Sequence, residues 1–406
     1  MRILFVNKFL YPNGGSETYC FKLAGYLMEK GHSVEFFGMR HEGNMVGNNL
    51  ELYVSNSEFK GISVKKLLYP FKIIYSLEAR DKIKKMLESF RPDIVHLNNY
   101  NFQITPSILY EIKKYNIPVL MTLHDFQLVC PNHMMYREHH AMICEECKGR
   151  RYYNCIRNKC VHNSGIKSAL AAFEGFLYYK LKTYDKYIDS YIAPSSFLKS
   201  KVVEFGEAEN RIITMHNFVN GATPCEKLAK SDYVLYFGRL SVQKGIRTLI
   251  KACRRLPEIK FVFAGSGELE SELKGIGNIV FAGFKTREEL KSMIKEALFS
   301  VYPSEWYENC PMSVLESQMY GTPVLGADIG GIPELIGNNA DGMLFEPGNV
   351  DELVEKIRLL YDDRHRLAEF SERCIQKVKG FSIDDYYTKL IDVYHCAAEK
   401  HKRRGE

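Results

Sequence analysis

Two carboxylates in the sequence have a spacing that suits the binding of hydroxyl groups. Glu308 and Glu316 are separated by Asn-Cys-Pro-Met-Ser-Val-Leu, and the proline in this run suits the first turn of a helix. Glu308 would then lie just before the helix, and Glu316 about one and a half turns inside it. A carboxylate accepts hydrogen bonds from two hydroxyls, which is the chemistry of sugar and ribose recognition. Glutamates at this spacing are also common on solvated helices, so the neighbouring motifs decide between the two interpretations.

Two cations lie in a loop that has a glycine at each end. Arg239 and Lys244 belong to the run Gly238-Arg-Leu-Ser-Val-Gln-Lys-Gly245, which follows an apolar run and precedes a helical pattern. In a strand–loop–helix unit, such cations can hold a diphosphate and neutralise it as it leaves, without a metal ion. The alternative is a pair of exposed surface cations. The glycines and the context favour the phosphate-binding interpretation.

Two adjacent glycines, Gly14 and Gly15, lie between the first apolar run and the first helical pattern. Backbone N–H groups of such a loop can approach a phosphate, helped by the N-terminus of the following helix. The pair is neither a complete G-x-G-x-x-G fingerprint nor a P-loop, and a tight turn explains it equally well. The residues alone leave both interpretations open.

The motifs lie at the ends of short apolar runs that alternate with helical patterns. Of the 406 residues, 46% are apolar and 26% are charged, as expected for a globular protein with two to three domains. Fully apolar runs of this length are typical of strands buried in a parallel sheet. Strands are predicted at 3–6, 33–37, 93–97 and 119–123, and again at 233–237, 261–264, 279–281, 300–302 and 323–325.

A break in this pattern near Asn217 divides the chain into two units. We predict an α/β fold in which two Rossmann-like, doubly wound parallel-sheet domains face each other across a cleft. The predicted parts are an N-terminal domain at 1–216, a linker at 217–232, a C-terminal domain at 233–382 and a helix at 383–406 that packs back towards the first domain. Ligands of open parallel sheets bind beyond the carboxyl ends of the strands, where the motifs above lie.

Taken in order, these motifs resemble those of the group-one, family 4 glycosyltransferases, which have the GT-B fold. The resemblance spans nearly the whole chain, and its most specific part is the Glu-x7-Glu motif together with the Arg…Lys pair. It rests on Gly14-Gly-Ser-Glu17, Gly238-Arg239…Lys244-Gly245, Ala264-Gly-Ser-Gly267, Phe281-Ala-Gly-Phe284, Glu308-x7-Glu316 and Gly330-Gly-Ile-Pro-Glu334.

The resemblance implies a role for each matching residue. Glu308 would bind the transferred sugar, Glu316 would bind the ribose, and Phe284 would lie beside the nucleobase. His124, at the end of a predicted strand, would sit over the reacting sugar, although an isolated histidine more often has a packing role. The implied catalytic residues are His124, Glu308, Arg239 and Lys244. The implied donor-binding residues are Gly14, Gly15, Gly238, Arg239, Lys244, Phe284, Glu308, Asn309, Cys310, Pro311, Met312 and Glu316.

The resemblance also implies a reaction. The family moves a sugar from a nucleotide-diphosphate sugar with retention of the anomeric configuration, and the leaving phosphate takes the proton of the acceptor. This route requires no cofactor and no nucleophilic carboxylate, in contrast to the two-carboxylate glycosidases. The expected donor is a UDP- or GDP-sugar, and the expected acceptor is a glycan or lipid-linked molecule in surface polysaccharide or glycolipid synthesis. Two alternatives stay open: a sugar-nucleotide epimerase of the same fold, and a non-catalytic nucleotide-sugar-binding subunit.

A cysteine-rich segment at 130–160 interrupts the first domain and departs from the core family pattern. Five of the eleven cysteines fall within it. Cys144, Cys147, Cys155 and Cys160 have C-x2-C and C-x4-C spacings, which suit four thiolate ligands of a structural zinc ion. Disulfides and unpaired thiols are the alternatives. The expected position beside the cleft makes this segment a candidate for acceptor recognition.

The charge is uneven along the chain, whose net charge is +6. The basic stretch from Lys60 to Lys85 and the aromatic-rich stretch from Phe173 to Tyr191 suggest peripheral contact with an anionic membrane at its inner face. A solvated surface explains the basic stretch equally well. No apolar run is long enough to span a bilayer and the start shows no signal peptide, so a cytoplasmic protein is expected. No nucleic-acid-binding signature is present.

Overall fold

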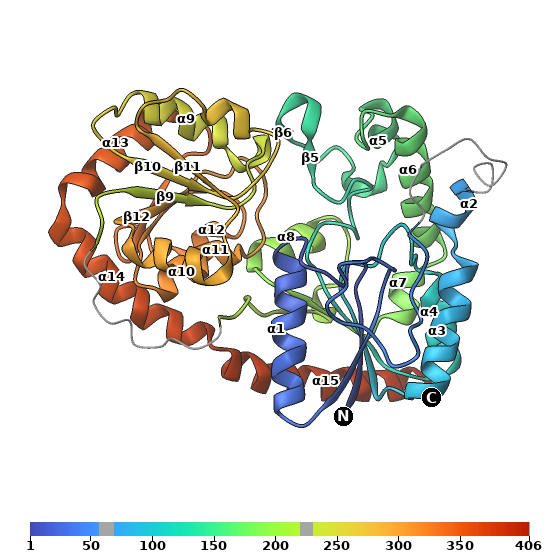
Figure 1. Cartoon of the computed structure of the whole chain (residues 1–406). Helices are drawn as coiled ribbons and strands as arrows, with labels where there is room; N and C mark the ends of the chain where they lie inside the picture. The colour runs from blue at the N-terminus through green and yellow to red at the C-terminus, as the bar shows by residue number, and fades with distance from the viewer. Residues whose placement is uncertain (57–68, 220–229, 406) are drawn as a thin grey trace.

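The computed structural model of the chain describes residues 1–56, 69–219 and 230–405, which form two α/β domains (Figure 1). Each domain is built around a sheet of six strands, and all the paired strands in both sheets are parallel. The predicted fold class, two doubly wound parallel-sheet domains, is confirmed.

The first sheet has the strand order of a doubly wound fold, because the chain adds strands first on one side of its opening strand and then on the other. The expected strands near residues 3–6, 33–37, 93–97 and 119–123 are all present. Across the sheet, the order is β2 (Ser33–Phe37), β1 (Arg2–Val6), β3 (Ile94–Leu97), β4 (Val119–Thr122), β7 (Ser190–Ala193) and β8 (Ile212–Thr214).

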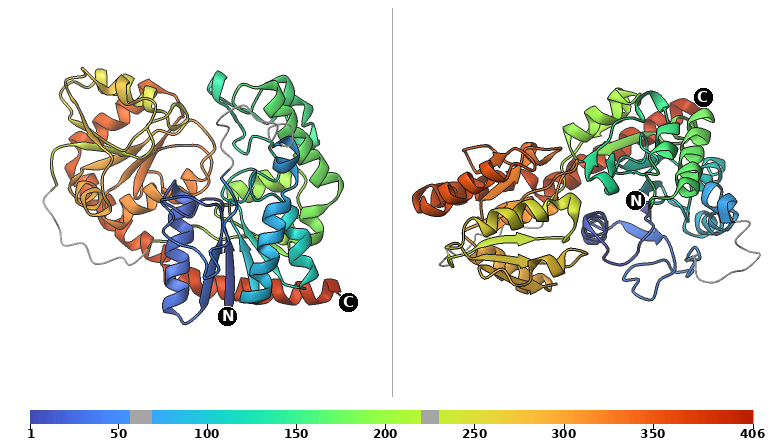
Figure 2. Two further views of the ribbon diagram at one scale, coloured as in Figure 1. Left: turned by 45° about the vertical axis from the view of Figure 1, so that its right-hand side comes forward. Right: turned by 90° about the horizontal axis from the view of Figure 1, so that it is seen from above.

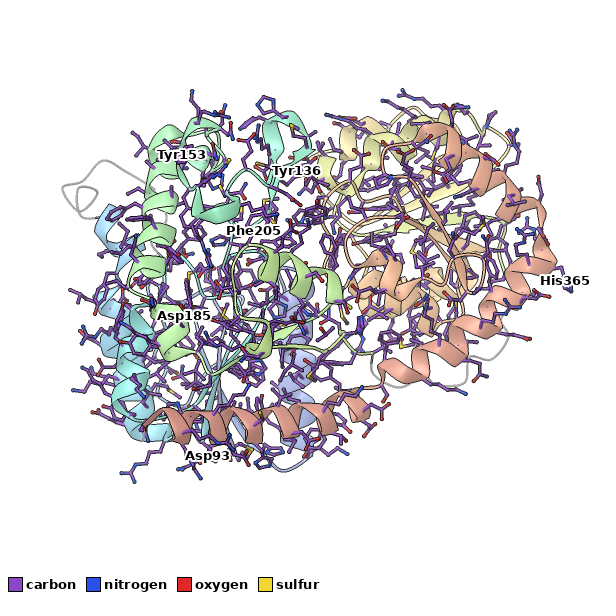
Figure 3. The ribbon with its side chains drawn as sticks, turned by 180° about the vertical axis from the view of Figure 1, so that it is seen from behind. Asp93, Tyr136, Tyr153, Asp185, Phe205 and His365 are labelled. Carbon is purple, nitrogen blue, oxygen red and sulfur yellow. The ribbon has the colours of Figure 1, made fainter. Side chains whose placement is uncertain are left out.

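Helices cover this sheet, and an insertion follows its fourth strand. The covering helices are α1 (Gly15–Glu29), α3 (Leu77–Phe90), α4 (Ser107–Lys114) and α8 (Ser196–Glu204), whereas α2 (Tyr69–Ile74) lies beside α6 (Gly165–Lys180). The insertion contains the hairpin of β5 (Tyr136–Arg137) and β6 (Met142–Ile143), followed by α5 (Tyr153–Arg157), α6 and α7 (Thr183–Tyr187). The hairpin stands on the side of the first domain that faces the second (Figure 1), and Tyr136 marks it in Figure 3.

The second domain has the strand order found in dinucleotide-binding folds. Across its sheet, the order is β11 (Ile279–Gly283), β10 (Phe261–Ala264), β9 (Val234–Phe237), β12 (Phe299–Tyr302), β13 (Val324–Ala327) and β14 (Gly342–Phe345). The helices that follow in the chain are α9 (Ile246–Arg254), α10 (Arg287–Glu296), α11 (Met312–Met319), α12 (Ile332–Leu335), α13 (Val350–Asp362), α14 (Arg364–Val378) and α15 (Ile383–Gly405). Among the described residues, no helix is both long and apolar enough to cross a bilayer.

Both faces of the first sheet are buried, which explains why its strands are continuous apolar runs. One face packs against α3, α4 and α8 through residues such as Ile83, Ile108 and Leu198. The opposite face packs against α1 and α15 through residues such as Leu23 and Leu390. The last helix of the chain is therefore part of the core of the first domain.

The course of α15 is visible in Figures 1 and 2, where it leaves the second domain and runs along the edge of the first. The position of α15 is fixed by polar contacts in addition to its apolar face. The hydroxyl of Tyr386 lies 2.6 Å from that of Tyr19, and the hydroxyl of Tyr394 lies 2.8 Å from Nδ1 of His96. Buried polar groups of this kind need partners, so these pairs favour one position of the helix.

The chain passes between the domains twice, and the described parts of the two crossings lie side by side. Val219 and Ser382 form an isolated parallel bridge, and the N–H of Val219 donates to the carbonyl of Phe381 at 2.9 Å. Most of the predicted linker at 217–232 lies outside the described residues, because 220–229 are not among them. The two neighbouring crossings form one hinge region.

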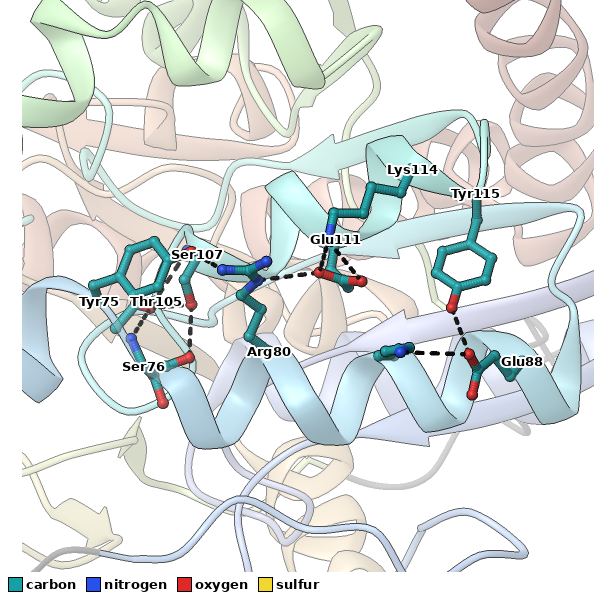
Figure 4. Close-up of polar contacts among 10 residues, drawn as sticks. Tyr75, Ser76, Arg80, Glu88, Thr105, Ser107, Glu111, Lys114 and Tyr115 are labelled. Carbon is teal, nitrogen blue, oxygen red and sulfur yellow. Dashed lines mark hydrogen bonds and ion pairs between the residues drawn. The ribbon is translucent and has the colours of Figure 1, made fainter.

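Part of the basic stretch that was predicted to meet a membrane lies on α3. Nε of Arg80 donates to Glu111 on α4 at 3.0 Å (Figure 4), and Nζ of Lys82 lies 2.6 Å from Glu78. These cations neutralise carboxylates of their own domain. In the described part of the stretch, the solvated-surface interpretation is therefore favoured, while residues 57–68 lie outside the described residues.

We expect the substitution Leu390→Ala to destabilise the first domain. Leu390 is 0% exposed, and removing its side chain leaves a cavity that costs about 2–5 kcal/mol of the free energy of unfolding. Urea unfolding followed by circular dichroism measures the loss. The exposed neighbour Lys389 provides the control, since Lys389→Ala should change the free energy by less than about 0.5 kcal/mol. A Leu390→Ala variant as stable as the control would contradict the packing described for α15.

Candidate functional site

The N-termini of two helices, one from each domain, approach each other where the two domains meet, and this region is here called the cleft. Helix α1 begins at Gly15 after β1, and α11 begins at Met312 after β12. A Cβ atom placed on Gly15 would lie 4.0 Å from Cγ of Met312, so the two helix starts approach closely. Helix N-termini carry partial positive charge and unpaired N–H groups. A negatively charged group is therefore favoured between them.

A buried ion pair lies close to the start of α11. Nζ of Lys244 is 2.6 Å from Oε1 of Glu308, whose side chain is only 8% exposed. Oγ of Ser304 and Nε1 of Trp306 each donate to the same oxygen at 2.6 Å. Lys244 also donates to the hydroxyl of Tyr302 at 3.0 Å. A lysine and a glutamate from two separate motifs thus form one cluster.

These partners set the ionisation of Glu308. Burial by itself would raise the pKa of Glu308, but the charge of Lys244 and the hydrogen bonds from Lys244, Ser304 and Trp306 hold this pKa below its ordinary value. The side chain is therefore a carboxylate at neutral pH. It can accept hydrogen bonds from hydroxyls, and it is unsuited to donate a proton.

A close approach of two loops brings Lys244 to Glu308. Lys244 ends the short 3-10 helix η5 (Val242–Lys244), and Gly245 follows it with a φ of 68°. A Cβ atom on Gly245 would lie 1.7 Å from the carbonyl oxygen of Pro303, in the loop that leads to Glu308. Only glycine fits at this position, both for its backbone conformation and for the approach.

Two glycines support the loop of Glu308 from the other side. A Cβ atom on Gly330 would lie 2.3 Å from the carbonyl oxygen of Glu308, and one on Gly331 would lie 1.7 Å from that of Asn309. The N–H of Gly331 donates to the carbonyl of Glu308 at 2.7 Å. A side chain at either position would displace the loop that carries the buried carboxylate.

His124 lies on the opposite wall of the cleft, just after β4. Its Nε2 is 2.9 Å from Oδ1 of Asn98, and its carbonyl accepts a hydrogen bond from Nδ2 of Asn309 of the second domain at 2.7 Å. The ring of Tyr19 packs edge-on against it at a centroid distance of 5.0 Å. Burial lowers the pKa of His124 to about 3. The imidazole is therefore neutral, and its proton is on Nε2 because an amide oxygen only accepts.

Two more polar contacts join the walls of the cleft. Nη2 of Arg239 donates to the carbonyl of Asn13, beside the glycine pair, at 3.4 Å. Lys22 on α1 forms an ion pair of 3.2 Å with Glu316 on α11. Arg239 thus lies at the edge of the glycine loop. Glu316 meets Lys22, a residue that the sequence analysis did not single out.

The other predicted donor-binding residues take different places. Gly238 directly follows β9, and Pro311 directly precedes α11. Cys310 is buried, and its Sγ accepts a hydrogen bond from the N–H of Asn217 at 3.3 Å. Phe284 follows β11 and is 80% exposed. Contact between Phe284 and a nucleobase stays a prediction.

Glu334, the last residue of the glycine motif at 330–334, binds the start of α8 in the first domain. It accepts hydrogen bonds from the N–H groups of Ser196 and Phe197 at 2.8 and 2.7 Å. Nε2 of His216 lies 2.8 Å from it. Carboxylates favour helix N-termini. This residue therefore joins the two domains below the cleft.

Several residues of the site carried little signal in the sequence. Four of them belong to no motif, and only the fold brings each to its partner: Lys22 to Glu316, Asn98 to His124, Tyr302 to Lys244, and Ser304 to Glu308. Trp306 had one signal, since it is the only tryptophan in the chain. Its indole N–H needs a partner when it is buried, and here that partner is the carboxylate of Glu308.

The cysteine-rich insertion gathers several of its thiols. Cys147 and Cys155 are buried in one small cluster, and Cys160 packs against it. A hydrogen bond with the thiol of Cys160 raises the pKa of Cys155. Within the described ranges, no three or more His, Cys, Asp or Glu side chains are arranged to hold a metal ion. Zinc binding by Cys144, Cys147, Cys155 and Cys160 stays a prediction.

Fold and site together define the class of protein. Two facing domains of parallel sheet, with cations, a buried carboxylate and two helix starts between them, have the architecture of the GT-B fold. Residues 13–222 match Glycosyltransferase Family 4, and residues 225–380 match the Glycosyl transferases group 1. The chain belongs to the group 1, family 4 glycosyltransferases, which confirms the family predicted from the motifs.

Individual proteins give the same result. An uncharacterized 42.6 kDa protein in the cps region of Klebsiella pneumoniae is 27% identical, over 82% of this chain and 87% of its own. A sulfoquinovosyl transferase of Arabidopsis thaliana is 26% identical, over 81% of this chain and 62% of its own. The crystal structure of Anabaena HepE in complex with UDP-glucose has the same fold. Its TM-score is 0.67 at 16% identity, and the match covers 97% of this chain and 99% of that one.

We expect His124 to remain neutral from pH 8 down to pH 5. Its pKa is lowered to about 3 by burial, so protonation occurs only in strong acid, and activity in this range carries no contribution from His124 ionisation. Long-range ¹H–¹⁵N spectra of histidine-labelled protein measure the charge state. The signal is assigned by its loss in His124→Gln. A titration midpoint near 6.5 would contradict the burial of the ring.

Proposed function

We propose that this chain transfers a sugar from a nucleotide-diphosphate sugar to a glycan or lipid-linked acceptor, with retention of the anomeric configuration. The observation that carries the proposal is the buried Lys244–Glu308 pair beside the start of α11, opposite the start of α1. It offers positive charge to a diphosphate and a carboxylate to sugar hydroxyls. A UDP-sugar is favoured over a GDP-sugar as donor, because the similar HepE structure holds UDP-glucose.

Different residues of the cleft would bind different parts of the donor. Arg239 and Lys244 hold the diphosphate and neutralise it as it leaves, so that catalysis needs no metal ion or other cofactor. Glu308 accepts hydrogen bonds from hydroxyls of the transferred sugar, and Glu316 accepts them from the ribose. Binding of the ribose replaces the contact between Glu316 and Lys22 by hydrogen bonds to hydroxyls.

The chemical step forms one bond and breaks one. The oxygen of an acceptor hydroxyl bonds to the anomeric carbon on the face from which the diphosphate leaves, and the bond from that carbon to the phosphate oxygen breaks. The phosphate oxygen keeps the electron pair and takes the hydroxyl proton, while Arg239 and Lys244 stabilise its charge. Glu308 acts as a binder, because three donors already converge on its Oε1. Neutral His124 lies over the reacting sugar.

An exposed apolar face supports a lipid-linked acceptor at a membrane. Ile166, Phe173 and Phe176 of α6 are 78%, 51% and 45% exposed, and their spacing places them on one face of the helix. Lys180 shares this face, with Nζ 5.7 Å from the ring of Phe176. Aromatic and aliphatic groups beside a cation suit an anionic bilayer surface. This face supports our further proposal that the protein is cytoplasmic and makes peripheral contact with the inner face of the plasma membrane.

We expect UDP-sugars to raise the melting temperature of the protein, and GDP- and ADP-sugars to do so less. Saturation at about 100 times the dissociation constant adds about 2.7 kcal/mol to the free energy of unfolding. Arg239→Ala should lose most of this gain, since it removes a diphosphate contact. Arg255→Ala is the matched control, because Arg255 pairs with Asp351 on the surface. A protein that responds to no nucleotide sugar would contradict the proposal.

Glu308→Gln provides a test of the chemistry. We expect kcat to fall about 10- to 100-fold, because a charge-assisted hydrogen bond to the sugar is weakened. No covalent glycosyl-protein should appear by mass spectrometry in the wild type or the variant. A trapped adduct would contradict the binding role of Glu308, and consumption of the donor without an acceptor would favour the epimerase reaction.

We expect the α6 face to bind anionic vesicles. Flotation with phosphatidylglycerol vesicles should recover the protein, and flotation with phosphatidylcholine vesicles should recover much less. Phe173→Asp with Phe176→Asp should weaken binding at least about tenfold, since two rings that would enter the bilayer surface are lost and two negative charges are added. Leu359→Asp on α13 is the control, because Leu359 is also exposed. Equal recovery of both variants would contradict this surface.

A further inference from the structure

Tyr307 belongs to the second domain but packs against the core of the first. It immediately precedes Glu308 in the loop after β12, and its ring joins the hydrophobic cluster of the first sheet. The ring lies edge-on to Phe197 of α8 at a centroid distance of 4.8 Å, and it is tilted against Phe126 at 6.1 Å. The apolar part of this side chain therefore sits in a socket of the opposite domain.

The polar end of Tyr307 is bound in the same socket. Its hydroxyl donates to Oε1 of Glu145 at 2.7 Å, and Nζ of Lys201 lies 2.6 Å from the same oxygen. Nζ of Lys201 also lies 5.5 Å from the centre of the Tyr307 ring. Burial raises the pKa of Tyr307 to about 12, so the hydroxyl remains a donor across the physiological range. The polar groups of Tyr307, Glu145 and Lys201, which come from two domains, thus serve as partners for one another.

The cysteine-rich insertion supplies one wall of this socket. Glu145 lies between Cys144 and Cys147, and the insertion is tied to the rest of the first domain by the ion pair of Arg150 with Glu207 at 2.6 Å. Both partners of that pair are largely buried. A buried pair with good geometry fixes the position of the elements that carry it. The insertion therefore holds Glu145 at a defined place beside the cleft.

The neighbours of Tyr307 in the chain face the donor site. Trp306 and Glu308 hydrogen-bond to each other, and Lys244 contacts Glu308 from the same side. Tyr307 points the other way, into the first domain. Because the two residues are adjacent in the chain, the tyrosine in its socket restrains the position of the Glu308 carboxylate in addition to the contacts of that carboxylate with Lys244, Ser304 and Trp306.

We propose that Tyr307 is a positioning residue, which docks into the socket of Glu145, Lys201 and Phe197 when the domains close and thereby sets Glu308 for the transferred sugar. The inference rests on the proposed role of Glu308 in sugar binding. It gives the cysteine-rich insertion a function in the donor half of the reaction. Closure of the first domain, which carries this insertion, is thereby coupled to the site that holds the sugar.

The first test is spectroscopic and needs no activity. Trp306 is the only tryptophan, so tryptophan emission of the whole protein reports on this loop alone. We expect Tyr307→Phe and Glu145→Gln to shift the emission to longer wavelength, because each releases the loop towards solvent. Tyr361→Phe is the matched control: it removes a tyrosine–carboxylate bond of 2.7 Å, to Asp232, on the surface of the second domain. Unchanged emission in both socket variants would overturn the proposal even if no donor were ever found.

The second test is kinetic and uses a double-mutant cycle. We expect Tyr307→Phe and Glu145→Gln each to lower kcat about tenfold, with the dissociation constant for UDP unchanged, because the nucleotide is held by other residues. The double variant should lose no more than either single variant, since both break one contact. Additive losses, or a kcat equal to that of Tyr361→Phe, would overturn the proposal. If the wild-type protein transferred sugar from no nucleotide sugar, the proposed function would be rejected. The emission test would then still decide whether Tyr307 holds the loop in its socket.

Discussion

The structure of the cleft depends on the burial of one negative charge. The carboxylate of Glu308 is 8% exposed, and a buried charge without partners costs several kcal/mol, so the surrounding chain must supply them. Lys244 reaches it only because Gly245 lets one loop lie against the carbonyl of Pro303. Trp306 satisfies its indole N–H on the same oxygen. The glycines, the cation and the aromatic residue of this region are therefore consequences of a single electrostatic requirement.

The same requirement explains how the two domains meet. The chain segment that carries Glu308 also makes contacts to the first domain, through Asn309 at the carbonyl of His124 and Tyr307 in its socket. Glu334 adds a cap on the start of α8. None of these contacts is a broad apolar interface; they are directed polar bonds and one ring in a pocket. Directed bonds can be made or lost as a set when domains move, which suits the proposed function, in which the cleft admits a donor and then encloses it.

The fold could be predicted from the sequence because buried parallel strands leave a simple pattern, whereas the site depends on distant partners. Strands such as Phe261–Ala264 are fully apolar, and α1 and α15 show clear apolar faces. The strand Ser190–Ala193 was not recognised, because its serine and tyrosine made it look like the end of an aromatic surface stretch. Lys244 and Glu308 were each identified by motif, but 64 positions separate them and only the fold shows that they pair. The sequence left the role of the α3 cations open for the same reason, since the carboxylate that neutralises Arg80 lies on another helix.

The charge pairs of the cleft bear on how the proposed donor can bind. Breaking a buried ion pair by removing one partner costs about 3–5 kcal/mol, so Lys244 and Glu308 cannot simply separate to receive a ligand. A nucleotide-diphosphate sugar avoids this cost because it carries both kinds of partner: phosphate oxygens for the cation and hydroxyls for the carboxylate. The pair of Lys22 with Glu316, which is 17% and 25% exposed, is weaker and can be exchanged for a ribose more readily. A fragment with only phosphate or only sugar would leave one charge of the buried pair poorly satisfied, so the proposed function implies selectivity for the intact donor, with the burial of Glu308 as its cause.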